Sequence, residues 1–186
     1  MNHSLVYPYA VFFHVLGTMG LVAFAGMEWA TLLRLRRDPE PSRVTAALSL
    51  LGIGQKLISI GVPVLLLSGL YLVHAAWPFT PWVAVGLVSM ALLGFLGGGF
   101  TGRHVKALMA SEGKALAAHL PALWTAFVLR ASILTATIFV MCAKPGLMGS
   151  VATLGIAVVG GMLIARGTGQ PAAASADASP SRPSAP

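Results

Sequence analysis

The feature that most constrains this chain is a set of five long apolar segments that carry almost no charge. They run over residues 8–33, 48–76, 81–102, 120–143 and 147–165. A helix needs about 20 predominantly apolar residues to cross the hydrocarbon core of a bilayer, and each segment meets or approaches that length. The sequence therefore predicts an all-α, polytopic transmembrane bundle with four core helices plus a fifth C-terminal helix.

Composition supports lipid as the solvent of this chain. Charged residues make up only 9% of the sequence, whereas a typical soluble domain is about one quarter charged. In a soluble protein, the net charge of +7 would suggest nucleic acid as a partner. Here the basic residues lie between apolar spans, where they set orientation and contact anionic headgroups. We expect the lipid bilayer as the partner, and no nucleic acid.

The distribution of Lys and Arg between the loops predicts the orientation of the bundle. Residues 74–80 and 144–146, which connect spans on one side, hold one Lys and no Arg. The connections on the other side are basic: Arg34, Arg36, Arg37, Arg43, Arg103, Lys106 and Lys114. Because cytoplasmic loops carry an excess of Lys and Arg, we predict that the N-terminus lies outside and the C-terminus inside.

Two of the spans have alternative interpretations, and the chain ends in a segment of a different kind. The first span contains Ala23-Phe24-Ala25, which resembles a signal-peptide cleavage site, but residues 1–7 lack a basic region. A retained helix is therefore favoured. The fifth span is short and rich in glycine, so a re-entrant segment is its alternative. We predict a transmembrane domain over residues 1–166 and a disordered cytoplasmic tail over 167–186, which is rich in Ala, Ser and Pro.

Three charged residues lie inside the apolar spans, where an ionisable side chain needs a partner or a function. Glu28, Lys56 and Arg130 fall at similar depths in the inner half of the bilayer, counting about 1.5 Å per residue from the cytoplasmic helix ends. We predict a polar intramembrane cluster in which Glu28 pairs with Arg130, with Lys56 or with both. One interpretation is structural, with Lys56 extending to the surface. The other is a polar pocket for an anion or a proton.

Two histidines form a second candidate site. His14 lies near the outer end of the first span, and His74 lies near the outer end of the second. Histidines on facing helices are able to ligate a haem iron axially. The alternative for each is a hydrogen bond to a backbone carbonyl or to a hydroxyl group. The sequence contains no Cys-x-x-Cys-His motif.

Glycines recur at every fourth residue near the end of the third span, at Gly94, Gly98 and Gly102. This spacing lets helices approach closely and is typical of packing against another helix, another membrane subunit or a second copy of the chain. No Gly-Lys-Ser/Thr follows, so a phosphate loop is not predicted. The sequence also lacks a Ser-His-Asp pattern and a zinc motif, which favours a non-enzymatic protein.

Short motifs over residues 8–146 carry a resemblance to a known family. They are His14-Val-Leu-Gly17, Phe79-Thr-Pro-Trp82, Gly102-Arg103 and Ala143-Lys-Pro-Gly146. With them the chain resembles the bacterial predicted integral membrane proteins grouped as domain of unknown function 2269. That resemblance implies a bacterial inner (plasma) membrane protein.

More distantly, the first span resembles the histidine-bearing first helix of the copper-resistance D-type proteins and of the haem-b protoporphyrinogen oxidase-like membrane proteins. In the oxidases a first-helix histidine is taken as a haem ligand, so the resemblance implies haem b at His14. Where those families tend to have a Trp before a Gly, this chain has the run from Leu21 to Phe24.

Three hypotheses for the function follow. The first is a small haem-associated or redox membrane protein that uses His14. The second is a non-enzymatic transporter-like or accessory membrane component whose inner polar cluster binds an ion or anion. The third is a structural partner for another membrane subunit, which the glycine spacing suggests.

Overall fold

The computed structural model describes residues 3–38, 40–76 and 80–169, and long helices account for most of them. The helices run over α1 (His3–Arg37), α2 (Pro41–Ala76), α3 (Pro81–Gly94), the π-helical segment η1 (Phe95–Thr101), α4 (Gly102–Ala110), α5 (Leu116–Ala143) and α6 (Leu147–Gly169). No strand occurs in these ranges. α6 continues past residue 165, the predicted end of the fifth span, and past residue 166, the predicted end of the transmembrane domain. Residues 170–186 of the predicted tail lie outside the described residues.

Within the described residues, five helices are long and apolar enough to cross a membrane, with α3, η1 and α4 counted together as one continuous helix. Their spans are Leu5–Arg37, Ser42–Ala76, Pro81–Ala110, Leu116–Ala143 and Leu147–Thr168. The predicted all-α bundle with five membrane-spanning helices is therefore confirmed. The fifth helix has the length of a full crossing rather than that of a short re-entrant segment.

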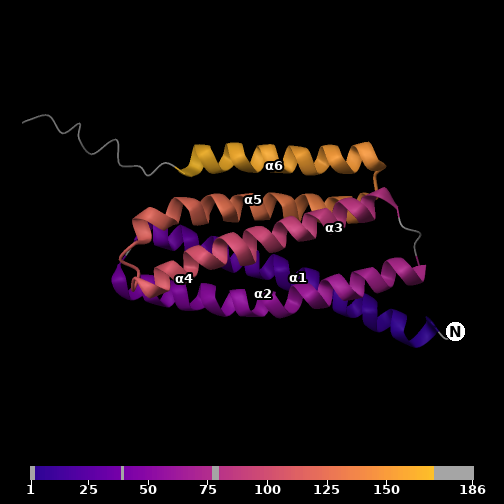
Figure 1. Ribbon diagram of the computed structural model, residues 1–186, viewed down its shortest axis with the longest axis horizontal. Helices are drawn as coiled ribbons and strands as arrows, with labels where there is room; N and C mark the ends of the chain where they lie inside the picture. Colours follow the sequence, from indigo (N-terminus) through magenta and orange to yellow (C-terminus); the bar gives the residue numbers. More distant parts are fainter. Residues whose placement is uncertain (1–2, 39, 77–79, 170–186) are drawn as a thin grey trace, which may run out of the picture.

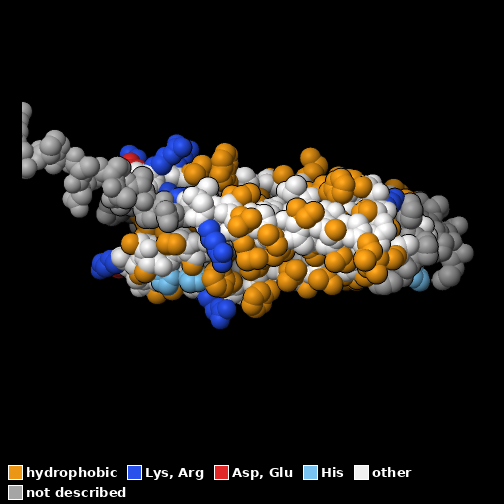
Figure 2. Space-filling view, turned by 90° about the horizontal axis from the view of Figure 1, so that it is seen from above, with side chains coloured by type: hydrophobic (Ala, Val, Ile, Leu, Met, Phe, Trp, Pro, Cys, Tyr) orange, Lys and Arg blue, Asp and Glu red, His pale blue; other side chains and the backbone are white. Residues whose placement is uncertain are grey.

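The helices lie side by side along one long axis, and successive spans run in opposite directions (Figure 1). α1 packs mainly against α2, and α5 packs mainly against α6. α6 lies on the outer side of α5, so α1, α2, α3 and α5 surround the interior (Figure 1). On the face shown in Figure 2, Lys and Arg side chains gather toward the end that holds the α1–α2 connection.

Proline and backbone geometry set several helix ends. α3 begins with Pro81 directly after Thr80, the position where the missing N–H of proline has no helical partner to lose. α5 ends at Ala143, and the next residue, Lys144, adopts a left-handed conformation with φ of 48°. Pro145 and Gly146 follow, and α6 then starts at Leu147. These breaks turn the chain back so that α6 lies against α5.

The π-helical segment η1 interrupts the third membrane-spanning helix. The hydroxyl of Thr101 donates to the carbonyl of Leu96, five residues earlier, at 2.9 Å. Gly97 is buried within this segment. Single π-helical turns inside α-helices are frequent at functional sites, and this one faces the interior cavity described below.

The main hydrophobic core lies toward the end of the bundle that holds the α1–α2 and α4–α5 connections. Its members come from α1, α2, α4, α5 and α6, and they include Leu32, Leu51, Leu108, Leu123 and Trp124. This core fixes these ends of the helices against one another. It lies just beyond the charged pair that forms the candidate site.

Candidate functional site

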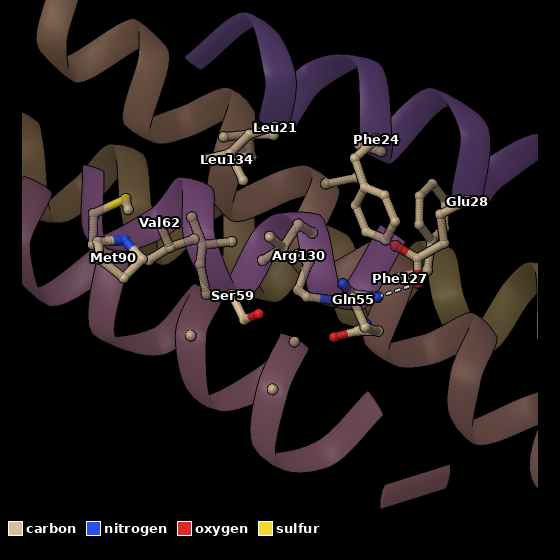
Figure 3. Close-up of a pocket in the computed structure, with 18 residues that line it drawn as sticks. Leu21, Phe24, Glu28, Gln55, Ser59, Val62, Met90, Phe127, Arg130 and Leu134 are labelled. Atoms are coloured by element: carbon tan, nitrogen blue, oxygen red, sulfur yellow. Dashed lines mark hydrogen bonds and ion pairs between the residues drawn. The ribbon is translucent and has the colours of Figure 1, made fainter. Parts of the chain in front are cut away.

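A cavity of about 290 Å³ lies between α1, α2, the α3–η1 helix and α5. Figure 3 shows side chains from these helices converging on it, with one dashed ion pair at its polar end. Most of its walls are apolar. The polar side chains that line it are Glu28, Gln55, Ser59 and Arg130.

Glu28 of α1 and Arg130 of α5 form a buried ion pair at this cavity. Nη2 of Arg130 donates to Oε1 of Glu28. The two residues retain only 2% and 8% of their surface exposed. A buried ion pair stabilises a fold only when close geometry and further hydrogen bonds offset the free energy lost as the two charges leave water. The structure thus brings together two of the three charged residues that the sequence placed at one depth.

The guanidinium group of Arg130 has more N–H groups than its neighbours use. Nε donates to the carbonyl of Ala126 at 3.3 Å, and Nη2 donates to Glu28. Within the described part of the chain, Nη1 has no hydrogen-bond acceptor. A Cβ built on Gly97 would lie 3.7 Å from Nη1, so η1 approaches the guanidinium closely. The cavity therefore contains charged N–H groups that are free to bond an acceptor.

Lys56 does not join this cluster. Its side chain is exposed, and it does not line the cavity. No ion pair links it to Glu28 among the described residues. The prediction that included Lys56 in the cluster used depth alone, and depth does not say toward which side of α2 a residue points. Its exposed position fits the structural alternative, in which the long side chain extends along the bundle surface.

Gln55 and Ser59 are cavity residues that the sequence reasoning did not single out. Gln55 precedes Lys56 on α2, and its side-chain amide makes no hydrogen bond within the described ranges. The hydroxyl of Ser59 donates to the carbonyl of Lys56 at 2.7 Å. Pro63 also lines the cavity and has no N–H to donate to the carbonyl of Ser59. The available signal was polar side chains and a proline inside an otherwise apolar span.

A second cavity of about 420 Å³ occupies the predicted outer half of the bundle, and His14 lines it. Nδ1 of His14 lies 3.1 Å from the carbonyl oxygen of Leu65 and 3.4 Å from the hydroxyl of Ser68. Because a carbonyl oxygen only accepts, Nδ1 carries the hydrogen in this bond. In the tautomer with its hydrogen on Nδ1, the lone pair lies on Nε2.

The structure does not bring His74 together with His14. His14 contacts α2 between Leu65 and Gly69, and His74 lies about 7.5 Å farther along that helix at 1.5 Å per residue. The side chain of His74 is exposed and does not line the outer cavity. Two axial ligands must hold one iron from opposite sides, so this arrangement does not fit a haem ligated by both histidines.

No cluster of three or more His, Cys, Asp or Glu side chains able to hold a metal ion occurs among the described residues. One pair of histidines does meet near the α4–α5 connection. Nδ1 of His104 lies 2.8 Å from Nδ1 of His119, so one ring donates and the other accepts. This contact was not predictable from the sequence, because the two residues belong to different helices.

Comparisons with protein-family models, with curated proteins and with solved structures find no match to this chain. The site must therefore be interpreted from its own geometry. That geometry is a mostly apolar cavity, closed at one end by a neutralised charge pair and supplied with unused hydrogen-bond donors.

Proposed function

We propose that this chain is a non-enzymatic membrane component, transporter-like or accessory, that binds a small molecule in the cavity of Glu28 and Arg130. The observation that carries the proposal is the free Nη1 edge of a buried guanidinium at a cavity wall. Nη1 is not one of the fully buried polar atoms that lack a partner among the described residues, so it keeps accessible surface at the cavity. Hydrogen bonds to charged groups contribute about 1.5–3 kcal/mol, and a ligand with an acceptor atom at Nη1 would gain such a bond.

The other polar groups of the cavity add orientation to this charge-assisted contact. The amide of Gln55 offers both a donor and an acceptor, and the oxygen of Ser59 still has lone pairs available. Binding sites for small molecules are mostly apolar cavities with a few convergent polar groups. The cavity has that composition, and its volume of about 290 Å³ suits a small molecule or one end of a larger one.

The experiment compares small molecules that remain bound when the protein is purified in detergent. Untargeted mass spectrometry is applied to organic extracts of four proteins: wild type, Glu28→Met/Arg130→Met, Gln55→Leu and Arg166→Gln. The double variant removes both charges together, because a lone buried charge would compromise folding. Arg166 is an exposed arginine on α6 and serves as the control.

We expect one small molecule in near-equal molar amount with wild type and with Arg166→Gln. It should be absent from Glu28→Met/Arg130→Met and reduced in Gln55→Leu. If all four extracts have the same composition, the cavity does not bind a retained small molecule and the proposal fails.

A second candidate function is a haem-associated or redox role with His14 as the only protein ligand. Its support is the hydrogen bond from Nδ1 to the carbonyl of Leu65, since metal-bound histidines usually donate their other N–H to such a group. The volume of about 420 Å³ beside His14 is the space available. A Soret band in protein expressed with ample haem, lost in His14→Ala, supports this candidate. A colourless wild-type protein excludes it.

We also propose that the protein resides in a bacterial inner membrane with its N-terminus outside, and that it is related to the family it resembles. The support is the loop distribution of Lys and Arg and the short motifs at His14, Trp82, Arg103 and Gly146. Reporter fusions after Arg37 and after residue 170 test the orientation. Both should report the cytoplasmic side.

A further inference from the structure

The exposed residues that line the cavity of Glu28 and Arg130 all belong to two neighbouring helices. Most of its lining residues are buried or half-buried. The four exposed ones are Ser59, Pro63, Gly94 and Gly98. Two belong to α2, and the other two belong to the α3–η1 helix. A Cβ built on Gly94 or Gly98 would have no atom within 4 Å, so the surface is open there.

This opening faces the bilayer rather than the water at either end. Ser59 lies near the middle of α2, which runs from Pro41 to Ala76. Gly94 and Gly98 likewise lie well inside the membrane-spanning helix Pro81–Ala110. A molecule that passes between α2 and the α3–η1 helix would therefore come from the hydrocarbon region.

From this geometry we infer that the ligand enters sideways from the bilayer, and that it is a neutral, lipid-soluble molecule with a carbonyl oxygen at one end. The inference rests on the proposed binding function and adds the route and the chemical class. The carbonyl accepts from Nη1 of Arg130, and the apolar remainder lies against the cavity walls.

The charge balance of the cavity favours a neutral ligand over an anionic one. Glu28 already neutralises Arg130, so a second anion would add a net negative charge in a medium of low dielectric constant. It would also lie close to the carboxylate of Glu28. A carbonyl oxygen uses the free N–H groups without that penalty.

The outer cavity provides space for a long apolar tail. Leu21, Met90 and Leu134 line both cavities, so these three side chains form the boundary between them. Figure 3 shows all three at the end of the inner cavity away from the Glu28–Arg130 pair. Along α1, Glu28 and His14 are separated by about 21 Å at 1.5 Å per residue. An extended alkyl chain with its head at Arg130 would reach His14 if these three side chains moved aside.

The experiment uses photoactivatable probes in lipid nanodiscs that contain the full-length protein. One probe is a monoacylglycerol and another is an alkyl-tailed benzoquinone, because both present a neutral carbonyl oxygen on an apolar body. Each carries a diazirine at the end of its tail. A fatty acid with the same tail tests the anionic alternative, and a tail-less benzoquinone is the water-soluble competitor.

Gly98→Leu blocks the opening without a clash in the helix, since nothing lies near its added Cβ. Gly20→Leu is the matched control, because Gly20 is also exposed with nothing within 4 Å. We expect at least one neutral probe to label wild type and Gly20→Leu on peptides that line the outer cavity. Labelling of Gly98→Leu should fall to the level measured without light.

These outcomes distinguish a failure of this inference from a failure of the proposed binding function. Equal labelling of Gly98→Leu and Gly20→Leu overturns the lateral route, and stronger labelling by the fatty acid overturns the neutral class. Equal competition by the tail-less benzoquinone, or no labelling of wild type by either neutral probe, overturns the lipid-soluble class. If Glu28→Met/Arg130→Met labels as well as wild type, the proposed binding role of the pair fails instead.

Discussion

The inner cavity, lined by Glu28 and Arg130, and the outer cavity, lined by His14, lie end to end along α1. Their polar groups are held in different ways. In the inner cavity, the charged side chains of Glu28 and Arg130 meet across two helices and both are buried. In the outer cavity, His14 is half-buried and bonds the backbone carbonyl of Leu65. A side-chain pair requires both residue types, whereas a carbonyl is present whatever residue occupies position 65.

This difference indicates how each site responds to change. Loss of one partner in the inner pair leaves a charge in a low-dielectric interior, where it has no replacement. Loss of His14 leaves a helix carbonyl that still has its own backbone bond. The inner site should therefore be sensitive to the identity of its residues, and the outer site should tolerate substitution.

The largest expected effect is on the inner pair. Arg130→Met leaves Glu28 buried without a partner and should lower the free energy of unfolding by about 3–5 kcal/mol. Glu28→Met/Arg130→Met removes both charges and should recover most of that loss, because apolar replacements of a buried pair are often neutral. Thermal unfolding in detergent measures both variants. Equal destabilisation of the single and double variants would show that side-chain volume, not charge, matters at this site.

The Glu28–Arg130 pair also shows which features of the molecule were predictable from the sequence and which were not. The spans were predictable because hydrophobic length is a local property of the chain. Glu28 and Arg130 were predictable as partners because a charge in an apolar span needs an opposite charge at the same depth. Lys56 shares their depth but lies exposed and away from the cavity. Depth leaves the direction around the helix open. Gln55 lines the cavity, and the next residue points about 100° away from it.

For a related reason, neither the partner of His14 in the outer cavity nor the π-helical segment η1 was predictable from the sequence. The partner of His14 depends on where α1 and α2 are in register, and that register is set by packing along the whole helix pair. In the observed register, His14 contacts Leu65 and does not meet His74. The spacing of Gly94, Gly98 and Gly102 predicted close packing, but it did not predict the π-helical segment Phe95–Thr101.

The second prediction compares the loss of stability caused by alanine at two glycines of α2, one next to each cavity. A Cβ at Gly54 would collide with the ring of Phe24, which lines the inner cavity. Gly54→Ala should therefore cost about 1–3 kcal/mol, as overpacking usually does. A Cβ at Gly69 would lie 2.9 Å from Cε1 of His14, and the end of that side chain is able to rotate away. Gly69→Ala should thus cost less.

Gly61→Ala is the control for this comparison, because a Cβ at Gly61 has nothing within 4 Å. Its unfolding temperature should match or slightly exceed that of wild type, since alanine is the better helix former. Thermal unfolding of the three variants in one detergent gives the order. A larger loss for Gly69→Ala than for Gly54→Ala would reverse the contrast between the two cavities.

The smallest expected effect is on the outer histidine. His14→Phe keeps a ring of similar shape and removes the bond to Leu65, so it should cost about 0.6 kcal/mol, the average for hydrogen bonds between helices in a membrane protein. His74→Phe changes an exposed ring and should have no effect on stability. Unfolding curves of both variants in haem-free protein measure this difference. A loss of several kcal/mol for His14→Phe would mean that the outer site is as specific as the inner one, because a bond to a backbone carbonyl alone does not account for that much energy.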